Sequence, residues 1–366
     1  MPELPEVETV AGDLRRHVLG ATIVDARVGW VRTIRDGDPV AFAAGVRGRR
    51  IEAVGRRAKL IVVELSGDAI LTIHLKMTGQ LFVVPRDVPE DPHVRVVLDL
   101  DDGRAIRFRD IRKFGRIGFY RRHEPGGAPL DRSGADPFEA LGPEPLDPAF
   151  DLRAFRRRIR GRRTRLKPLL TDQAVLAGVG NIYADEALWA ARLHPLRSAR
   201  SLRPGDERAL YTELRRILAE AVARRGSSID DYTAPDGDGA MQERLLVYQR
   251  TGEPCERCGR PIRRIVVGGR ATHFCSWCQR LPAEERAAGA AILAGITPRP
   301  GRAAGRRGRR WVELEGDGAL GITEAERSAH GSRAERTRRA AAARRARARA
   351  GSAPVQRPGA GSAKAG

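Results

Sequence analysis

Met1-Pro2-Glu3-Leu4-Pro5-Glu6-Val7-Glu8-Thr9-Val10 opens the chain, and this stretch predicts a first helix and a reactive amine. Methionine is normally trimmed before a small residue, so we expect Pro2 to become the N-terminus. A terminal α-amino group titrates near ~8, so part of it is unprotonated and nucleophilic at neutral pH. Attack on a sugar carbon at the aldehyde oxidation level would form an iminium ion, a form of covalent catalysis. The simpler interpretation is a helix start, with Pro5 at the first helical position and Glu6 and Glu8 at the positive end of the dipole.

Beyond this stretch, apolar residues recur first at helical spacing and then in short runs typical of strands. The helix is expected to continue through Val18, where Gly20 can end it. The following runs are rich in Val and Ile and are separated by turn signals such as Ser66-Gly67-Asp68. They lie at residues 21–30, 60–65, 70–75, 94–100, 106–109 and 117–120. This pattern predicts an antiparallel β-sandwich that ends near Arg121.

The middle of the chain changes from a linker composition to a helical pattern. Residues 122–150 are rich in Pro, Gly and Asp, which is typical of a linker. Helices are expected at residues 152–159, 168–177, 182–191 and 206–225. Gly178-Val179-Gly180-Asn181 precedes one of them, and a helix start favours an anion, with Lys167 nearby as a point charge. The simpler interpretation of Gly-x-Gly is an ordinary turn.

Cys255-Glu256-Arg257-Cys258 and Cys275-Ser276-Trp277-Cys278 contain all four cysteines of the chain, with sixteen residues between the pairs. In a reducing compartment this spacing predicts four thiolate ligands for one closed, tetrahedral zinc site. Such a site is structural, so the metal should do no chemistry. Residues 263–267 and 270–274 predict two strands, and Gly268-Gly269 suits the hairpin loop between them. We therefore expect a zinc finger built on a hairpin, whose arginines are by default solvated charges.

Composition favours a partner that carries phosphates. The 366 residues carry a net charge of +21, and the pI is about 11.1. Such a balance is typical of proteins that bind nucleic acid. Apolar runs all fall short of the ~18 residues that a membrane span needs. The acidic N-terminus also lacks the apolar core of a secretory signal, so we expect a cytoplasmic protein.

Residues 281–366 differ from the rest of the chain. They are rich in Ala, Arg and Gly, and eighteen basic against eight acidic residues give them a charge of +10. We expect this tail to be disordered over much of its length. Basic clusters at 306–310 and 333–349 would add sequence-independent affinity for DNA by releasing counterions. The alternative is a solvated tail that only aids solubility.

Two basic turns lie at the ends of predicted strands, His74-Leu75-Lys76-Met77-Thr78-Gly79 and Asp110-Ile111-Arg112-Lys113-Phe114-Gly115. If exposed, Met77 or Phe114 beside arginine would suit a wedge inserted into the minor groove. The alternative for both is ordinary core packing. Lys59 enters another predicted strand and is by default a solvated lysine.

Together these motifs resemble the formamidopyrimidine-DNA glycosylase family, also called MutM, within the wider group that includes endonuclease VIII. The resemblance runs from Pro2 to about Arg280. Beyond the stretches already quoted, it includes Arg57-Ala58-Lys59, Leu141-Gly142-Pro143-Glu144-Pro145-Leu146 and residues 178–185. The ordered series of matches makes accidental similarity a poor explanation.

The resemblance implies an α+β multidomain fold with DNA in the cleft between its two halves. Its parts would be an N-terminal catalytic β-sandwich with flanking helices (2–121), a linker (122–150), a helix–two-turns–helix DNA-binding domain with a lesion-capping loop (151–240), a zinc finger (245–280) and a disordered basic tail (281–366). The family excises oxidised purines such as 8-oxoguanine and formamidopyrimidines from damaged double-stranded DNA, and then cuts the strand by β,δ-elimination. We expect a monomer that carries one structural Zn²⁺.

Catalytic roles follow from the resemblance, motif by motif. Pro2 resembles the nucleophile that forms a Schiff base at C1′, and Glu3 the acid/base residue beside it. Lys59 matches a lysine associated with β-elimination and phosphate contact. Arg270 matches a finger arginine linked to phosphate binding and δ-elimination.

Other matched residues would support the site or bind DNA. Met77, Arg112 and Phe114 match the trio that fills the gap left by a flipped lesion, and flipping costs a few kcal/mol. Glu6 matches a supporting carboxylate. The remaining DNA contacts implied by the resemblance are His93, Arg162, Lys167 and Asn181.

Three features depart from the family pattern. The loop at residues 233–242 has Met241 where an aromatic residue is usual, and in the family this loop covers the extruded base. Gln249 stands where the family usually has glycine. The basic tail has no counterpart in the family's minimal members.

Two alternatives remain beside the glycosylase for oxidised purines. One is an endonuclease VIII-like glycosylase for oxidised pyrimidines, although that branch usually differs at Leu4-Pro5 and at the trio of Met77, Arg112 and Phe114. The other is a non-catalytic DNA- or RNA-binding protein that uses the finger and the tail. The presence of Pro2, Glu3 and Lys59 together argues against it.

Overall fold

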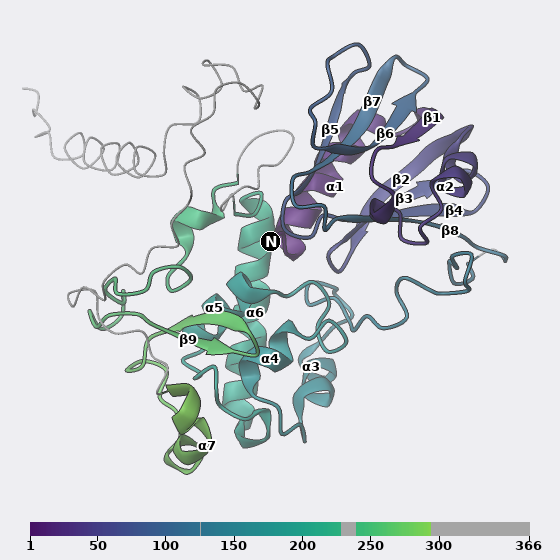
Figure 1. The fold of residues 1–366 in the computed structure, drawn as a ribbon. Coiled ribbons are helices and arrows are strands. Elements are labelled where there is room, and N and C mark those ends of the chain that lie inside the picture. Colours follow the sequence, from purple (N-terminus) through teal and green to yellow (C-terminus); the bar gives the residue numbers. More distant parts are fainter. Residues whose placement is uncertain (125, 228–238, 294–366) are drawn as a thin grey trace, which may run out of the picture. The chain divides into compact units, whose positions relative to one another are not determined.

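The computed structural model describes residues 1–124, 126–227 and 239–293, all of which belong to one unit of the chain, Met1–Arg302 (Figure 1). The predictions for loop residues 233–238 and for the tail from residue 294 onward lie outside these described residues. Within them a sheet domain, a helical domain and a small finger follow one another along the chain, as predicted.

The N-terminal domain is an antiparallel sheet with two helices. Its elements are α1 (Leu4–Val18), β1 (Thr22–Val28), η1 (Val31–Thr33), α2 (Pro39–Val46), β2 (Arg49–Arg57), β3 (Leu60–Leu65), β4 (Ala69–His74), β5 (Gly79–Pro85), β6 (Val94–Leu100), β7 (Arg104–Asp110) and β8 (Arg116–Arg121). The strand order is β5-β7-β6-β1-β2-β3-β4-β8.

Strand β1 divides this sheet into two halves. Thr22 and Ile23 pair with β2, whereas the rest of β1, up to Val28, pairs with β6 beyond a register shift between Ile23 and Asp25. Such irregularities bend a strand and increase its twist. The halves β5-β7-β6-β1 and β2-β3-β4-β8 and helix α1 contribute side chains to one core cluster. The predicted sandwich is therefore confirmed.

Four elements of this domain were not predicted: the short turn η1, α2, β2 and β5. Strand β2 carries five charged residues among nine, so its sequence lacks the apolar run that identifies a strand. It is a strand because β1 and β3 pair with it on either side. Strand β5 ends in Pro85, which the position of β5 at the sheet edge tolerates.

The helical domain contains α3 (Leu152–Ile159), α4 (Leu166–Thr171), α5 (Asn181–Ala190) and α6 (Pro204–Ala223), with short turns η2 (Ala199–Ser201) and η3 (Met241–Arg244). The helix predicted at 168–177 is wrong in extent, because the chain leaves the helix at Asp172. The Asp172 side chain accepts a hydrogen bond from Ala174 N at 3.0 Å. Such a local bond competes with helix continuation.

The finger hairpin consists of β9 (Arg263–Val267) and β10 (Arg270–Phe274), as predicted. The start of the predicted tail is different, because α7 (Ala283–Leu293) is a helix. Leu293 packs against the core cluster that contains Leu196 and Phe274. Glu285 accepts a hydrogen bond from Ser198 N at 2.6 Å. Residues 283–293 are thus an ordered part of the fold. None of the helices in the described ranges is both long and apolar enough to cross a membrane.

The residue Gln249 has a strained backbone, which the family's usual glycine at this position would relieve. Its φ is +58° and its side chain is exposed. For residues other than glycine this left-handed conformation costs roughly 1–2 kcal/mol. We predict that Gln249→Gly raises the free energy of unfolding by about 0.5–1 kcal/mol, after the larger chain entropy of glycine is subtracted. Gln249→Ala keeps the strain and should bring no gain. Equal unfolding midpoints in denaturant for the wild type and Gln249→Gly would contradict this account.

Candidate active site and metal centre

The Glu3 carboxylate lies at the N-terminus of α5, at the junction of the two domains. Its Oε1 accepts a hydrogen bond from Ile182 N at 2.8 Å, and its Oε2 one from Tyr183 N at 3.4 Å. The anion expected at this helix start is therefore a carboxylate of the protein itself. A helix N-terminus stabilises negative charge through its free N–H groups.

Two glycines before α5 make this approach possible. A Cβ at Gly180 would lie 2.2 Å from Glu3 Cδ, so any larger residue would displace the carboxylate. Gly178 has φ of +86°, and its carbonyl accepts a hydrogen bond from Leu4 N at 3.0 Å. The motif Gly178-Val179-Gly180 is thus more than an ordinary turn, because it receives the N-terminus of the chain.

Glu6 joins the N-terminus to the helical domain. Its Oε2 accepts from Glu3 N at 2.9 Å, and its Oε1 accepts from the Tyr183 hydroxyl at 2.5 Å. Ser227 donates to the same Oε1 from its backbone N at 2.8 Å and from its hydroxyl at 3.0 Å. Burial raises the pKa of Tyr183, so the phenol keeps its proton and serves as a donor. Neither Tyr183 nor Ser227 was singled out in the sequence, since their contact with Glu6 is non-local.

The amine of Pro2 is enclosed in the full-length chain. Met1 is exposed, whereas Pro2 and Glu3 are buried. While Met1 is attached, the proline nitrogen is part of a peptide bond and has no nucleophilic lone pair. The chemistry expected of Pro2 therefore requires removal of Met1.

Lys59 is close enough to Glu3 for their charges to interact. The lysine is only 6% exposed, which excludes the interpretation of a solvated side chain. Burial lowers the pKa of Lys59, the Glu3 carboxylate opposes this, and the Arg270 guanidinium adds to it. Burial also raises the pKa of Glu3, while Lys59 works against the rise. Glu3, Lys59 and Arg270, from three separate parts of the chain, thus lie close enough for their charges to act on one another.

The turn that carries Lys59 is held by Glu144 of the predicted linker. Glu144 Oε1 accepts from Ala58 N at 2.6 Å and from Arg57 Nη1 at 3.0 Å, and its Oε2 accepts from Arg56 Nη1 at 2.8 Å. Ala58 has φ of +54°, a conformation that needs such support. Part of the linker therefore braces the site.

Met77, Arg112 and Phe114 all project from turns of the N-terminal domain. Met77 is 38% and Phe114 48% exposed, so neither is a core residue. The Arg112 guanidinium lies 4.9 Å from the centre of the Phe114 ring, which is cation–π distance. The exposure that a wedge requires is present.

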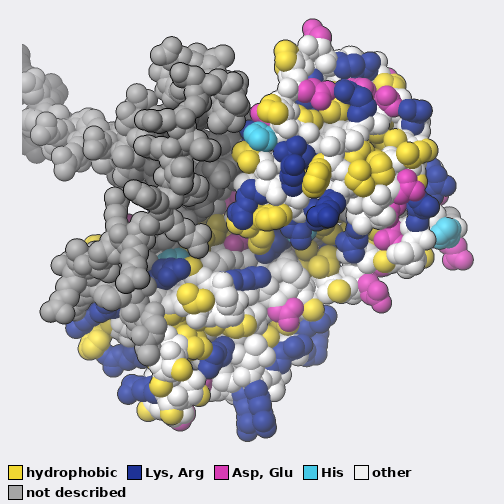
Figure 2. Space-filling view, viewed as in Figure 1, with side chains coloured by type: hydrophobic (Ala, Val, Ile, Leu, Met, Phe, Trp, Pro, Cys, Tyr) yellow, Lys and Arg dark blue, Asp and Glu magenta, His cyan; other side chains and the backbone are white. Residues whose placement is uncertain are grey.

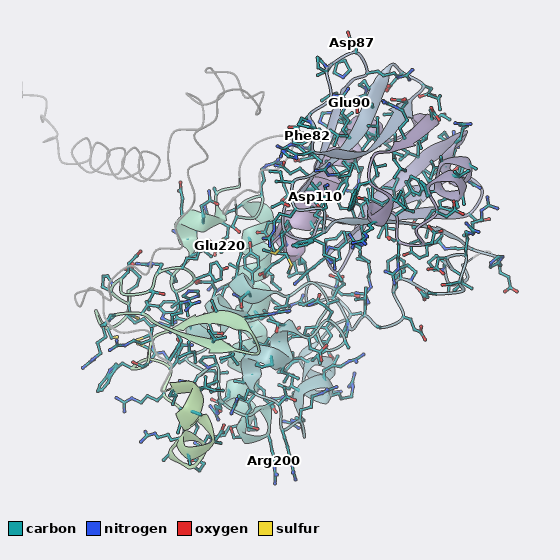
Figure 3. The ribbon with its side chains drawn as sticks, in the orientation of Figure 1. Phe82, Asp87, Glu90, Asp110, Arg200 and Glu220 are labelled. Carbon is teal, nitrogen blue, oxygen red and sulfur yellow. The ribbon has the colours of Figure 1, made fainter. Side chains whose placement is uncertain are left out.

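Asp110, whose side chain is labelled in Figure 3, connects the two turns through hydrogen bonds. Its Oδ1 accepts from the Thr78 hydroxyl at 2.5 Å and from Arg112 N at 3.2 Å, and its Oδ2 from Gly115 N at 2.7 Å. The carbonyl of His93, another predicted DNA contact, accepts from Asp110 N at 2.9 Å. A single buried carboxylate thus fixes the relative position of both turns.

The remaining predicted DNA contacts differ in accessibility. Arg162 is exposed, and Asn181 donates from Nδ2 to the Ala271 carbonyl at 2.8 Å, which links α5 to the finger. Lys167 departs from the prediction: it is 1% exposed and pairs with Asp185 at 2.5 Å. It therefore cannot contact phosphate in this conformation without breaking a buried ion pair.

Asp185 and Glu186 anchor the finger to α5. Asp185 Oδ2 accepts from His273 N at 2.9 Å, and Glu186 accepts from the backbone N–H groups of Leu246, Val247 and Tyr248 at 2.8 to 2.9 Å. Burial raises the pKa of Glu186, and these three bonds oppose the rise. The finger is thus fixed to the helix that receives Glu3.

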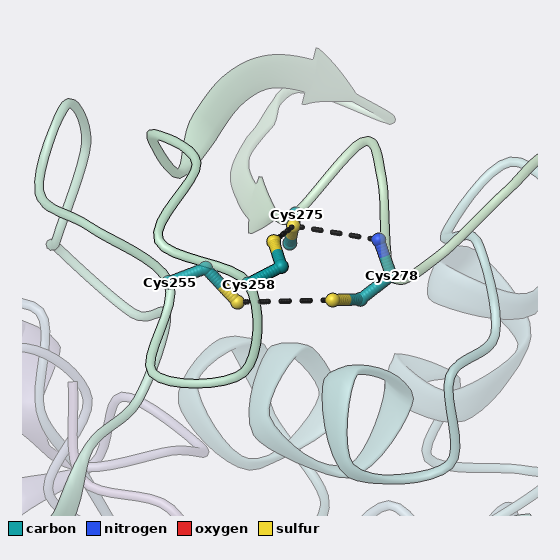
Figure 4. A group of neighbouring side chains, drawn as sticks. All are labelled: Cys255, Cys258, Cys275 and Cys278. Atoms are coloured by element: carbon teal, nitrogen blue, oxygen red, sulfur yellow. Dashed lines mark hydrogen bonds between the residues drawn. The ribbon is translucent and has the colours of Figure 1, made fainter.

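The four cysteines converge as predicted (Figure 4). Their sulfur atoms lie within 4.8 Å of one another, with Cys255 Sγ 3.9 Å from Cys278 Sγ and Cys258 Sγ 3.5 Å from Cys275 Sγ. Tetrahedral zinc with Zn–S bonds of about 2.3 Å requires S···S distances of about 3.8 Å, so the geometry fits Zn²⁺. Trp189 Nε1 donates to Cys255 Sγ at 3.4 Å, the kind of outer contact that supports a thiolate ligand. The residues hold one structural zinc.

These features define a class of multidomain protein in which an N-terminal sheet domain, a helical domain and a four-cysteine finger follow one another, with a buried carboxylate joining the first two. Family models match in the same order: the formamidopyrimidine-DNA glycosylase N-terminal domain at residues 1–117, the formamidopyrimidine-DNA glycosylase H2TH domain at 141–233 and the zinc finger found in FPG and IleRS at 252–281. The chain belongs to the formamidopyrimidine-DNA glycosylase family, whose members are base-excision-repair enzymes of the glycosylase/AP lyase type.

Individual relatives support this assignment. The chain is 46% identical over 282 residues to the formamidopyrimidine-DNA glycosylase of Herpetosiphon aurantiacus, covering 76% of this chain and all of the relative. It resembles the structure of Lactococcus lactis Fpg in complex with DNA containing an abasic site, with a TM-score of 0.70, 34% identity and coverage of 76% and 100%. It also resembles the MutM (Fpg) structure from Thermus thermophilus, with a TM-score of 0.66 and 44% identity, and the match covers 76% of this chain and 98% of that chain.

We predict that zinc removal abolishes DNA binding but leaves the sheet domain folded. Without metal the thiolates lose the ligand that closes the finger, whereas the sheet domain has a core of its own. Fluorescence anisotropy with a lesion duplex measures the first effect, and hydrogen exchange in β3 and β4 measures the second. A chelated, metal-free protein that incises DNA at the normal rate would show that the finger is dispensable.

Proposed function

We propose that this protein is a bifunctional DNA glycosylase and AP lyase that excises oxidised purines, 8-oxoguanine and formamidopyrimidines, from damaged duplex DNA. The observation that carries the proposal is the buried Glu3 carboxylate beside Pro2, held by the N-terminus of α5 and opposed by the Lys59 ammonium. A raised carboxyl pKa next to a buried amine is the arrangement that general acid–base chemistry requires.

In this mechanism the Pro2 nitrogen attacks C1′ of the flipped nucleotide. The N-glycosidic bond breaks and the base leaves with a proton, and the C1′–O4′ bond of the sugar ring then breaks as O4′ takes up a proton, so the ring-opened sugar remains bound to Pro2 as an iminium ion. Glu3, which burial keeps protonated to higher pH, supplies a proton to the sugar. Removal of a proton from C2′ then expels the 3′ phosphate by β-elimination, and a second elimination expels the 5′ phosphate.

Lys59 and Arg270 would act on the phosphates and on the elimination steps. Burial makes the Lys59 amine a weaker base than ordinary lysine, so it releases its proton more readily. Arg270 is exposed on β10, and a guanidinium there suits contact with a leaving phosphate. We assign further phosphate contacts to His93, Arg162 and Asn181, and the role of Lys167 to holding Asp185 and α5 in place.

Met77, Arg112 and Phe114 would fill the space that the extruded nucleotide leaves. Lys and Arg side chains outnumber acidic ones on the face of the molecule in Figure 2, as expected for a surface that meets a phosphate backbone. We place the activity in the bacterial cytoplasm, at the nucleoid, and expect a monomer, because one chain supplies Pro2, Lys59 and Arg270.

Covalent trapping tests the role of Pro2. Borohydride reduces an iminium ion, so it should join the Met1-processed protein to lesion DNA. We predict that Pro2→Gly, which keeps an amine but alters its basicity and position, lowers the trapped yield at least about 100-fold, a loss of roughly 3 kcal/mol in transition-state stabilisation. Mass spectrometry of the trapped peptide identifies the attachment point. Trapping that survives acetylation of the N-terminus would assign the nucleophile to a lysine instead.

Excision from a stable base pair tests the wedge. Met77→Ala and Phe114→Ala should each slow single-turnover excision of a paired lesion by about 10-fold. Without the inserted side chain, less of the free-energy cost of flipping the base is offset. Cleavage at a preformed abasic site, where no base is flipped, should change little. Ile111→Ala is the matched control, since Ile111 is 43% exposed on the same turn. Equal losses on both substrates would mean that these side chains only stabilise the turns.

A further inference from the structure

A cleft beside the zinc ligands is lined by arginines and has no part in the proposed mechanism. It has a volume of about 460 Å³, and its lining residues are Arg192, Arg257, Cys258, Trp277, Cys278 and Arg280. The lining includes three guanidinium groups and no carboxylate. Arg260 stacks on Trp277, one of the lining residues, and adds a fourth cation beside the cleft.

These four arginines have no carboxylate partner in the part of the chain that the structure describes. By contrast, the nearby Arg250 pairs with both Glu253 and Glu256 at 2.9 Å. Glu213, whose charge reaches Arg257, is itself paired with Arg216 at 2.8 Å. A zinc ion with four thiolates carries a formal charge of −2, so four guanidinium groups leave a surplus of positive charge in the cleft.

Aromatic stacking and backbone contacts hold three of these four cations in place, Arg257, Arg260 and Arg280. The guanidinium carbons of Arg260 and Arg280 lie 3.8 and 4.1 Å from the centre of the Trp277 ring. Arg257 lies 3.7 Å from the Trp189 ring centre and donates to the Trp189 carbonyl. Arg257 also donates to the Ala190 carbonyl at 3.0 Å, so its Nη groups are both engaged. Arg280 donates from Nε to the Trp277 carbonyl at 3.4 Å, which leaves its Nη–H groups for phosphate oxygens.

The cleft is remote from the lesion site along two elements. Glu3 binds the N-terminus of α5, whereas Arg192 follows the C-terminus of this ten-residue helix, about 15 Å away at 1.5 Å per residue. Arg270 begins β10 at the loop of the hairpin, while the zinc ligands Cys275 and Cys278 follow the other end of the same strand. A phosphate in the cleft is therefore not the phosphate of the reacting nucleotide.

We propose that this cleft, lined by Arg192, Arg257 and Arg280 beside Trp277, is a second DNA site that binds the phosphodiester backbone outside the lesion site. The inference rests on the proposed function only in taking DNA as the ligand. The backbone has two sources: the distant part of the same duplex, or a second DNA segment. Both offer the same phosphate chemistry.

A salt titration on undamaged duplex tests the site. Arg192→Ala combined with Arg280→Ala should flatten the slope of log affinity against log salt by about 2, since each phosphate contact contributes about 0.9. Arg200→Ala combined with Arg208→Ala is the matched control, because it removes two exposed charges from the helical domain (Arg200 in Figure 3) and should leave the slope nearly unchanged. Zinc content is measured in every variant.

Two further experiments distinguish the distant part of the same duplex from a second DNA segment. If the same duplex reaches the cleft, the double variant loses affinity for long duplexes but not for short ones. If a second segment binds, wild-type protein already trapped on lesion DNA captures a labelled duplex and the trapped double variant does not. An unchanged slope in the double variant overturns the proposal, and so does loss of zinc, which would assign the arginines to neutralising the thiolates. Wild-type protein that fails to trap lesion DNA would instead contradict the proposed function.

Discussion

The Glu3 carboxylate at the N-terminus of α5 is the interaction on which the rest of the structure depends. It holds the first residues of the chain against the helical domain through Ile182 N at 2.8 Å. The same helix carries Asp185 and Glu186, which fix the finger and its Arg270. One ten-residue helix thus sets the positions of Pro2, Glu3 and Arg270, although Arg270 lies far from the other two in sequence.

Two ionisable side chains of this arrangement, Glu3 and Lys59, are buried. Both groups lose hydration. Burial raises the pKa of Glu3 and lowers the pKa of Lys59, so it favours the neutral form of each group. A pair of this kind is poor evidence for stability, because desolvation opposes the gain from attraction. It does suit proton transfer, since neither group holds its charge as firmly as it would in water. Glu144 makes the arrangement possible by fixing the turn at Ala58 through its N–H at 2.6 Å.

The sequence was most informative where structure is local. The hairpin of β9 and β10 was predicted to the residue, because two C-x2-C pairs and Gly268-Gly269 fix its ends. Strand β2 was missed, since its charged sequence becomes a strand only between β1 and β3. Contacts between residues far apart in sequence could not be predicted either. Glu3 accepts a hydrogen bond from Ile182 N, and Lys167 is buried in an ion pair with Asp185 instead of facing a phosphate. The family resemblance supplied the names of the site residues, and the structure supplies their neighbours.

Gly180→Ala tests the central claim most directly. A Cβ at this position would lie 2.2 Å from Glu3 Cδ, so it should displace the carboxylate. The substitution changes neither Pro2 nor Lys59. Gly205→Ala in α6 is the control, because a Cβ there meets nothing within 4 Å. The account predicts that folded Gly180→Ala protein, with zinc bound, forms little borohydride-trapped complex with lesion DNA, whereas Gly205→Ala traps it normally. Wild-type trapping by Gly180→Ala would contradict the claim that Glu3 at the start of α5 organises the active site.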